Sequence, residues 1–154
     1  MNVEGDGNCG FRAVAVALGR DQSEWPPIRN LLKSNMEYNH FFYQKMFKEG
    51  YKEILSTIDW FTGECLNNKE KWMVMPEFGA IITNSFNRPV VYLSHAQCLT
   101  FLPTINTDNV CKEIIGIGWF SEHFVSIQLT NDCPLPPIAG SWRKWCEGYW
   151  DDDL

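Results

Sequence analysis

A cysteine stands on a short, polar, glycine-containing loop in residues 6–12, DGNCGFR. Apolar residues then recur at the i, i+3, i+4 and i+7 positions of one helix face, from Phe11 to Leu18, and Gly19 follows as a stop signal. Cys9 is therefore expected in the first turn of a buried helix, where unpaired backbone N–H groups carry partial positive charge. Such charge stabilises a thiolate over a thiol, so the pattern predicts a nucleophilic cysteine.

Two other interpretations of this loop carry less weight. Residues 5–10 also satisfy the dinucleotide-binding pattern G-x-G-x-x-G, but that motif follows a strand and only residues 1–4 precede it here. A cysteine at the start of an apolar helix is also often an ordinary buried thiol. The neighbouring Asp6 and Asn8, together with a histidine far downstream, favour the nucleophile over both alternatives.

The candidate general base is His123, in the segment EHFVSIQL at residues 122–129. Alternation along a strand places His123, Val125 and Ile127 on one face, and we expect this apolar row to point inward. A cysteine that needs a base favours a catalytic histidine at this place over a structural one.

These two segments together resemble the catalytic blocks of the ovarian tumour (OTU) family of cysteine deubiquitinases. Three further segments are similar to OTU domains of plants and fungi, some of them fused to transposase-like proteins: residues 72–79, 97–103 and 133–137. The resemblance covers nearly the whole chain. It implies a single OTU-like catalytic domain over residues 1–154 with an OTU-type cysteine-protease fold.

The resemblance also implies an activity and a set of site residues. The expected reaction is hydrolysis of the isopeptide or peptide bond after the carboxyl-terminal glycine of ubiquitin, with ubiquitin or polyubiquitin as the partner. Catalytic roles fall on Cys9, His123 and Asp6, and the oxyanion loop includes Gly7 and Asn8. Backbone N–H groups of that loop would hold the tetrahedral oxyanion.

One position departs from the family pattern. Many OTU enzymes place Asp or Asn two residues after the histidine, where it orients the imidazole. Val125 occupies that position here, and a valine cannot accept the ring N–H. The third member of the site is therefore expected elsewhere, with Asp6 as the first candidate and Glu4 as another.

Three other functions agree with the same residues. They are a non-catalytic ubiquitin-binding OTU-like module, a hydrolase for another ubiquitin-like modifier, and an inert structural domain. Val125 favours the first of these. If the chain is an enzyme, Cys9 is expected to be alkylated near neutral pH ahead of the other five cysteines.

Composition sets further limits. A chain of 154 residues with 45% hydrophobic content suits one domain, and a net charge of −6 without a long basic run argues against direct nucleic-acid binding. Six scattered cysteines without a C-x-x-C pair predict neither a zinc site nor a disulfide framework, and no cofactor is expected. The sequence shows no signal peptide and no membrane-length apolar stretch, so we expect a cytoplasmic or nuclear protein without membrane association. A monomer is also expected.

The elements that must position the site change character halfway along the chain. Apolar periodicity predicts helices in the first half, at residues 9–18, 27–36, 41–47, 51–61 and 76–84. Short β-branched or aromatic runs predict strands in the second half, at residues 89–93, 98–102, 114–117 and 124–129. This order indicates an α+β fold, a small central sheet covered by helices. The second helix should bury residues 28, 31, 32 and 36, and the aromatic tail should close the core.

Overall fold

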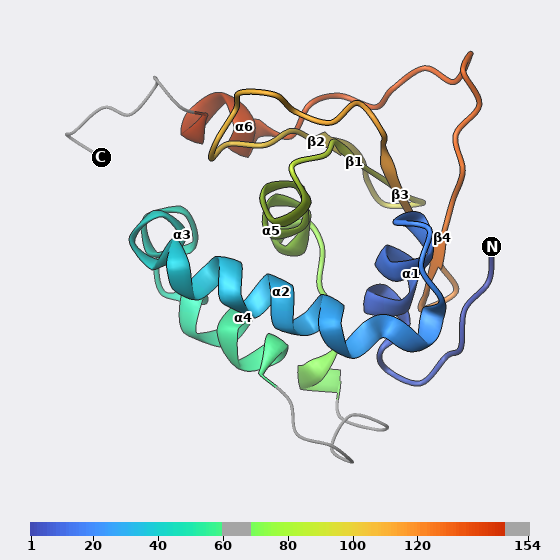
Figure 1. Cartoon of the computed structure of the whole chain (residues 1–154), viewed down its shortest axis with the longest axis horizontal. Coiled ribbons are helices and arrows are strands. Elements are labelled where there is room, and N and C mark those ends of the chain that lie inside the picture. The colour runs from blue at the N-terminus through green and yellow to red at the C-terminus, as the bar shows by residue number, and fades with distance from the viewer. Residues whose placement is uncertain (60–68, 147–154) are drawn as a thin grey trace.

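A computed structural model describes residues 1–59 and 69–146 (Figure 1). The helices are α1 (Cys9–Ala17), α2 (Trp25–Tyr38), α3 (His40–Phe47), α4 (Gly50–Ile58), α5 (Glu77–Phe86) and α6 (Gly140–Trp145), with the 3₁₀ turns η1 (Gln22–Glu24) and η2 (Lys69–Lys71). The strands are β1 (Val90–Ser94), β2 (Cys98–Phe101), β3 (Ile115–Phe120) and β4 (His123–Ser126). The predicted α+β class, helical first and strand-rich second, is confirmed.

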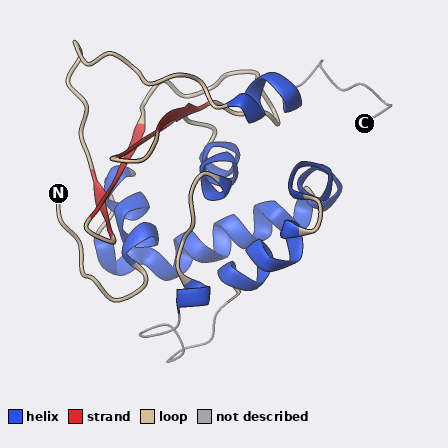
Figure 2. Cartoon of the chain, turned by 180° about the vertical axis from the view of Figure 1, so that it is seen from behind, coloured by secondary structure: helices blue, strands red, loops and turns tan. Residues whose placement is uncertain are grey.

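The four strands form one mixed sheet in the order β2-β1-β3-β4. β1 runs parallel to β3, while the β1–β2 and β3–β4 pairs are antiparallel. Other segments pair with both edges. Met1 donates to the Ser126 carbonyl of β4 at 2.6 Å, and the Thr100 N–H of β2 donates to the Pro137 carbonyl at 2.9 Å. The amino-terminal segment, residues 1–5, consequently runs beside β4 (Figures 1 and 2).

Helices α1 and α5 pack between the sheet and α2 (Figure 2). α1 contacts β3 and β4, α5 contacts β1 and β2, and both helices contact α2. The core between them is apolar: Phe11 and Phe78 meet edge to face at 5.9 Å, and Ile115 and Ile117 are fully buried. Each such side chain contributes about 1.5–3 kcal/mol by its burial. Packing of α1 against the sheet therefore fixes the position of its first residue, Cys9.

The predicted buried face of α2 was wrong at one position. Ile28, Leu32 and Met36 are fully buried, but Leu31 is 44% exposed. The buried residues follow an i, i+4, i+8 row, which leaves Leu31 at the edge of a narrow apolar stripe. The helix also begins earlier than Pro27, because η1 leads directly into it.

Two other expectations concern the chain's less regular parts. The tail supplies α6, which the sequence did not predict as a helix, and its Trp145 is buried as expected. Tyr149 and Trp150 lie outside the described residues, as do the last residues of the predicted helix 51–61. Within the described parts of the chain, no helix combines the length and apolarity needed to cross a membrane.

Candidate active site

The cysteine loop, residues 6–9, leads Cys9 into the first residue of α1, as the sequence predicts. Asp6 Oδ1 accepts a hydrogen bond from the backbone N–H of Asn8 at 3.1 Å. Gly7, between them, has a φ of +80°, which a residue with a Cβ adopts only with strain. This tight turn lets the chain reverse direction and enter the helix within three residues.

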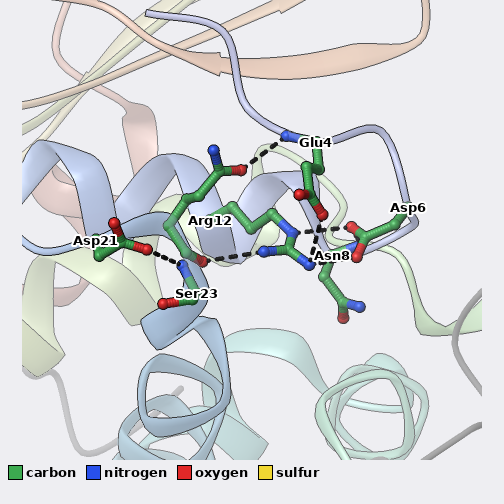
Figure 3. A network of polar contacts seen from close by, with 7 residues as sticks. Glu4, Asp6, Asn8, Arg12, Asp21 and Ser23 are labelled. Atoms are coloured by element: carbon green, nitrogen blue, oxygen red, sulfur yellow. Dashed lines mark hydrogen bonds and ion pairs between the residues drawn. The ribbon is translucent and has the colours of Figure 1, made fainter.

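Arg12 holds the loop from inside α1 (Figure 3). Its Nε donates to Asp6 Oδ1 at 3.1 Å and its Nη2 to Asp6 Oδ2 at 2.5 Å, so the pair is bidentate. Nη1 donates to the Gln22 carbonyl at 3.2 Å, and Nη2 lies 3.3 Å from the Glu4 carboxylate. One guanidinium therefore joins the cysteine loop to the amino-terminal segment and to η1.

The charge of Arg12 also determines the ionisation of Asp6. Burial alone would raise the pKa of Asp6, but hydrogen bonds from Arg12 and from the Asn8 backbone outweigh it and hold that pKa below its ordinary value. Asp6 is thus a carboxylate bound to Arg12 at neutral pH, and it faces the helix rather than the histidine.

His123 begins β4 directly after a two-residue turn. Ser121 and Glu122 have φ values of +52° and +59°, and Phe120 pairs with His123 across the hairpin. Positive φ at both central residues is the mark of a type I′ turn, whose twist matches that of the strands. Neither residue is Gly, Asn or Asp, so this hairpin has no typical sequence signal.

The predicted inward face of β4 was wrong. Phe124 and Ser126 are 4% and 6% exposed, whereas His123 and Val125 are only half-buried. Strand alternation separates the two faces correctly but does not say which one a helix covers. α1 contacts β4, and the buried face of the strand is that of Phe124 and Ser126. His123 therefore lies on the more accessible face.

The ring of His123 is held by Asn2. Its Nε2 lies 2.9 Å from Oδ1 of Asn2, and an amide oxygen can only accept, so Nε2 carries the proton of the neutral ring. Nδ1 is then the basic nitrogen. A Cβ added to Gly5 would lie 3.6 Å from Nδ1, which places this nitrogen against the segment leading into the cysteine loop.

Cys9 is buried beside the start of β4, at 8% exposure. Burial raises the pKa of the Cys9 thiol, hydrogen bonds from the backbone N–H groups of Phe124 and Gly10 oppose the rise, and the Asp6 carboxylate adds to it. The expected lowering of the Cys9 pKa was therefore wrong, because desolvation outweighs the helix-terminus effect. A thiol in this state can act as a nucleophile only with a base that removes its proton.

The structure thus brings the predicted residues together in part. Cys9 and the start of β4 are neighbours, since the backbone N–H of Phe124, the residue after His123, donates a hydrogen bond to the Cys9 sulfur. Asp6 and Gly7 shape the loop. Asn8 is 3% exposed, and its Oδ1 has no hydrogen-bond partner among the described residues, so its side chain does not cap α1. Nowhere in residues 1–59 or 69–146 do three metal-ligating side chains gather.

Two residues of the site escaped sequence reasoning. Arg12 had a signal: a lone cation inside the apolar run FRAVAVAL must find a partner when that run becomes a buried helix. Asn2 had none, because its contact with His123 depends on the amino-terminal segment lying along β4, a long-range pairing that leaves no local pattern.

Comparisons with known proteins bear on the fold. No family model matches the sequence, and no curated protein matches it either. Solved structures do. The viral OTU domain protease from Dera Ghazi Khan virus is 20% identical with a TM-score of 0.57, over 85% of this chain and 80% of that one. The OTU domain of OTUD1 is 19% identical with a TM-score of 0.54, over 83% of this chain and 84% of that one.

A third structure, the viral OTU domain protease from Farallon virus, is 18% identical with a TM-score of 0.52, over 86% of this chain and 84% of that one. Each likeness spans most of both chains, although few residues are identical. The elements described above, from α1 with its cysteine to β4 with its histidine, therefore have the fold of OTU domain proteases.

Proposed function

We propose that this chain is an OTU-family cysteine deubiquitinase, a single catalytic domain that acts on ubiquitin or polyubiquitin. One observation carries the proposal: the cysteine at the start of α1 lies beside the strand whose histidine has its basic nitrogen next to Gly5, the residue that leads into the cysteine loop. This is the arrangement of nucleophile and base that cysteine acyl transfer needs. The OTU fold supports it.

The proposed mechanism uses residues of this chain alone. His123 Nδ1 takes the Cys9 proton as the sulfur attacks the carbonyl carbon of the terminal glycine. Backbone N–H groups of Gly7 and Cys9 stabilise the oxyanion. The Asn8 N–H, which was expected to contribute, is held by Asp6 Oδ1 instead. The imidazolium then protonates the leaving amine as the C–N bond breaks and a thioester forms. Water, losing a proton to His123, hydrolyses the thioester and restores the thiol.

Ubiquitin as the substrate follows from the resemblance of the sequence to OTU deubiquitinases. The chain's net charge of −6 is compatible with a partner that has basic residues at its contact surface. A hydrolase for another ubiquitin-like modifier would use the same cysteine and histidine. The non-catalytic alternative loses its main support, since Asn2 supplies the acceptor that Val125 lacks.

The test is reaction of the purified chain with a ubiquitin probe carrying a carboxyl-terminal electrophile, alongside cleavage of polyubiquitin. Cys9→Ala should abolish both while the protein stays folded. Cys98→Ala is the matched control, because Cys98 is an exposed free thiol away from the site, and it should leave both unchanged. His123→Ala should reduce cleavage by about 10²-fold or more.

Two results would contradict the proposal. Cleavage by Cys9→Ala at the wild-type rate would show that Cys9 is not the nucleophile. Labelling by a probe of another ubiquitin-like modifier, without labelling by the ubiquitin probe, would move the chain to the alternative substrate class.

A further inference from the structure

The strand that carries His123 has no hydrogen-bond acceptor at the position that should orient the histidine ring. Val125 follows His123 by two residues on the same face of β4, and its side chain has no polar atom. An imidazole held only by packing can rotate about its side-chain bonds and exchange the proton between its two nitrogens. A working base requires one tautomer in one orientation.

Asn2 fills this need from another part of the chain. Its Oδ1 accepts from His123 Nε2 at 2.9 Å and also from the backbone N–H of Val3 at 3.1 Å. The second bond fixes the direction of the amide, because an oxygen bound to a local backbone donor cannot turn away without losing it. The carboxamide is thus already oriented to accept a hydrogen bond from the ring N–H.

The segment that carries Asn2 is itself seated on β4. Met1 donates to the Ser126 carbonyl at 2.6 Å, and the Ser126 N–H donates back to the Met1 carbonyl at 3.2 Å. Val3 is 5% exposed and belongs to the core. Glu4 N–H donates to the Gln22 side chain at 2.9 Å. Contacts on both sides of Asn2 therefore hold it in register with the histidine.

We infer that Asn2 is the positioning residue for His123, acting as the third member of the site in place of a residue at position 125. This inference rests on the proposed function. Its oxygen keeps the proton on Nε2 and leaves Nδ1 free for the Cys9 thiol. Because the amide is neutral, it orients the ring without the additional stabilisation of imidazolium that a carboxylate gives.

The first experiment measures rates and their pH dependence. Asn2→Ala should lower kcat for ubiquitin cleavage by roughly tenfold to a hundredfold, with a much smaller change in KM. Asn2→Asp retains the acceptor and should recover most of the rate. Its pH–rate profile should shift to higher pH, since a carboxylate beside the ring favours the imidazolium. Asn30→Ala, on the exposed face of α2, is the matched control and should match wild type.

The second experiment does not depend on ubiquitin. Imidazole ¹⁵N spectra resolve three histidines, and His40→Gln and His95→Gln assign the remaining signal to His123. Wild type should show the Nε2–H tautomer, whereas Asn2→Ala should show a mixture. If this holds in a protein that cleaves no ubiquitin, the positioning contact stands and the proposed substrate fails.

Other outcomes would overturn the inference itself. Asn2→Ala with wild-type kcat and an unchanged His123 tautomer would show that the ring is oriented by something else. Equal loss of rate in Asn2→Ala and Asn2→Asp, together with lowered thermal stability of both, would mean that Asn2 serves the fold and not the histidine.

Discussion

The cysteine loop is held by an ion pair inside the molecule, whereas the histidine ring is held by a neutral hydrogen bond near the surface. The Arg12 and Asp6 side chains are 10% and 19% exposed and meet in a bidentate pair. Asn2 is exposed, and it meets a half-buried His123 through one bond. The two contacts differ in what they hold: the first ties the cysteine loop to the body of the fold, and the second orients the histidine ring.

The two sides also differ in how the backbone turns. The cysteine loop uses glycine at its one positive φ, +80° at Gly7. The histidine hairpin uses Ser121 and Glu122 at +52° and +59°. Side chains at such angles cost roughly 1–2 kcal/mol per residue. The cysteine side is therefore free of this strain, and the histidine side retains it.

The strongest test of the comparison removes the ion pair. Arg12→Met leaves the Asp6 carboxylate partly buried without its cation, and the free energy of unfolding should fall by about 3 kcal/mol. Asn2→Ala, on the other side, should change it by less than about 0.5 kcal/mol. Urea denaturation measures both. Arg20→Met, at an exposed arginine, is the control, and a loss in Arg12→Met no larger than in that control would break the comparison.

The protonation state of Cys9 should have an effect of intermediate size on its rate of alkylation. Since the pKa of Cys9 is raised, little thiolate is present at neutral pH, and iodoacetamide should label Cys9 more slowly than the exposed Cys98. Below its pKa, the Cys9 labelling rate should increase roughly tenfold per pH unit. Mass spectrometry after limiting labelling at several pH values measures this. Preferential labelling of Cys9 at pH 7 would show instead that His123 already holds it as a thiolate.

The smallest expected effect concerns the hairpin. Replacing Ser121 by Asn and Glu122 by Gly supplies residues that accept positive φ, so unfolding free energy should rise by about 1 kcal/mol. Gly7→Ala makes the opposite change on the cysteine side and should lower it by about 1–2 kcal/mol. Thermal unfolding of the two variants measures both changes in stability. A destabilised hairpin variant would mean that Ser121 or Glu122 has a contact more important than backbone strain.

Sequence reasoning reached furthest where the determinants are local. The helix beginning at Cys9, the turn around Gly7 and the strand character of the second half all follow from residues within a few positions of one another. Prediction from the sequence was less accurate where a neighbouring element determines which face of a helix or strand is buried. The exposure of Leu31 and the choice of the buried face of β4 depend on which element packs against each face, and sequence periodicity does not contain that information.

The sequence by itself determined the nucleophile loop, the histidine segment and the absence of an acceptor at Val125. Only the tertiary structure decided what replaces that acceptor. Asn2 reaches His123 because the amino-terminal segment lies along an edge strand that is more than a hundred residues away. It also raised the pKa of Cys9, because packing buries this thiol in the core.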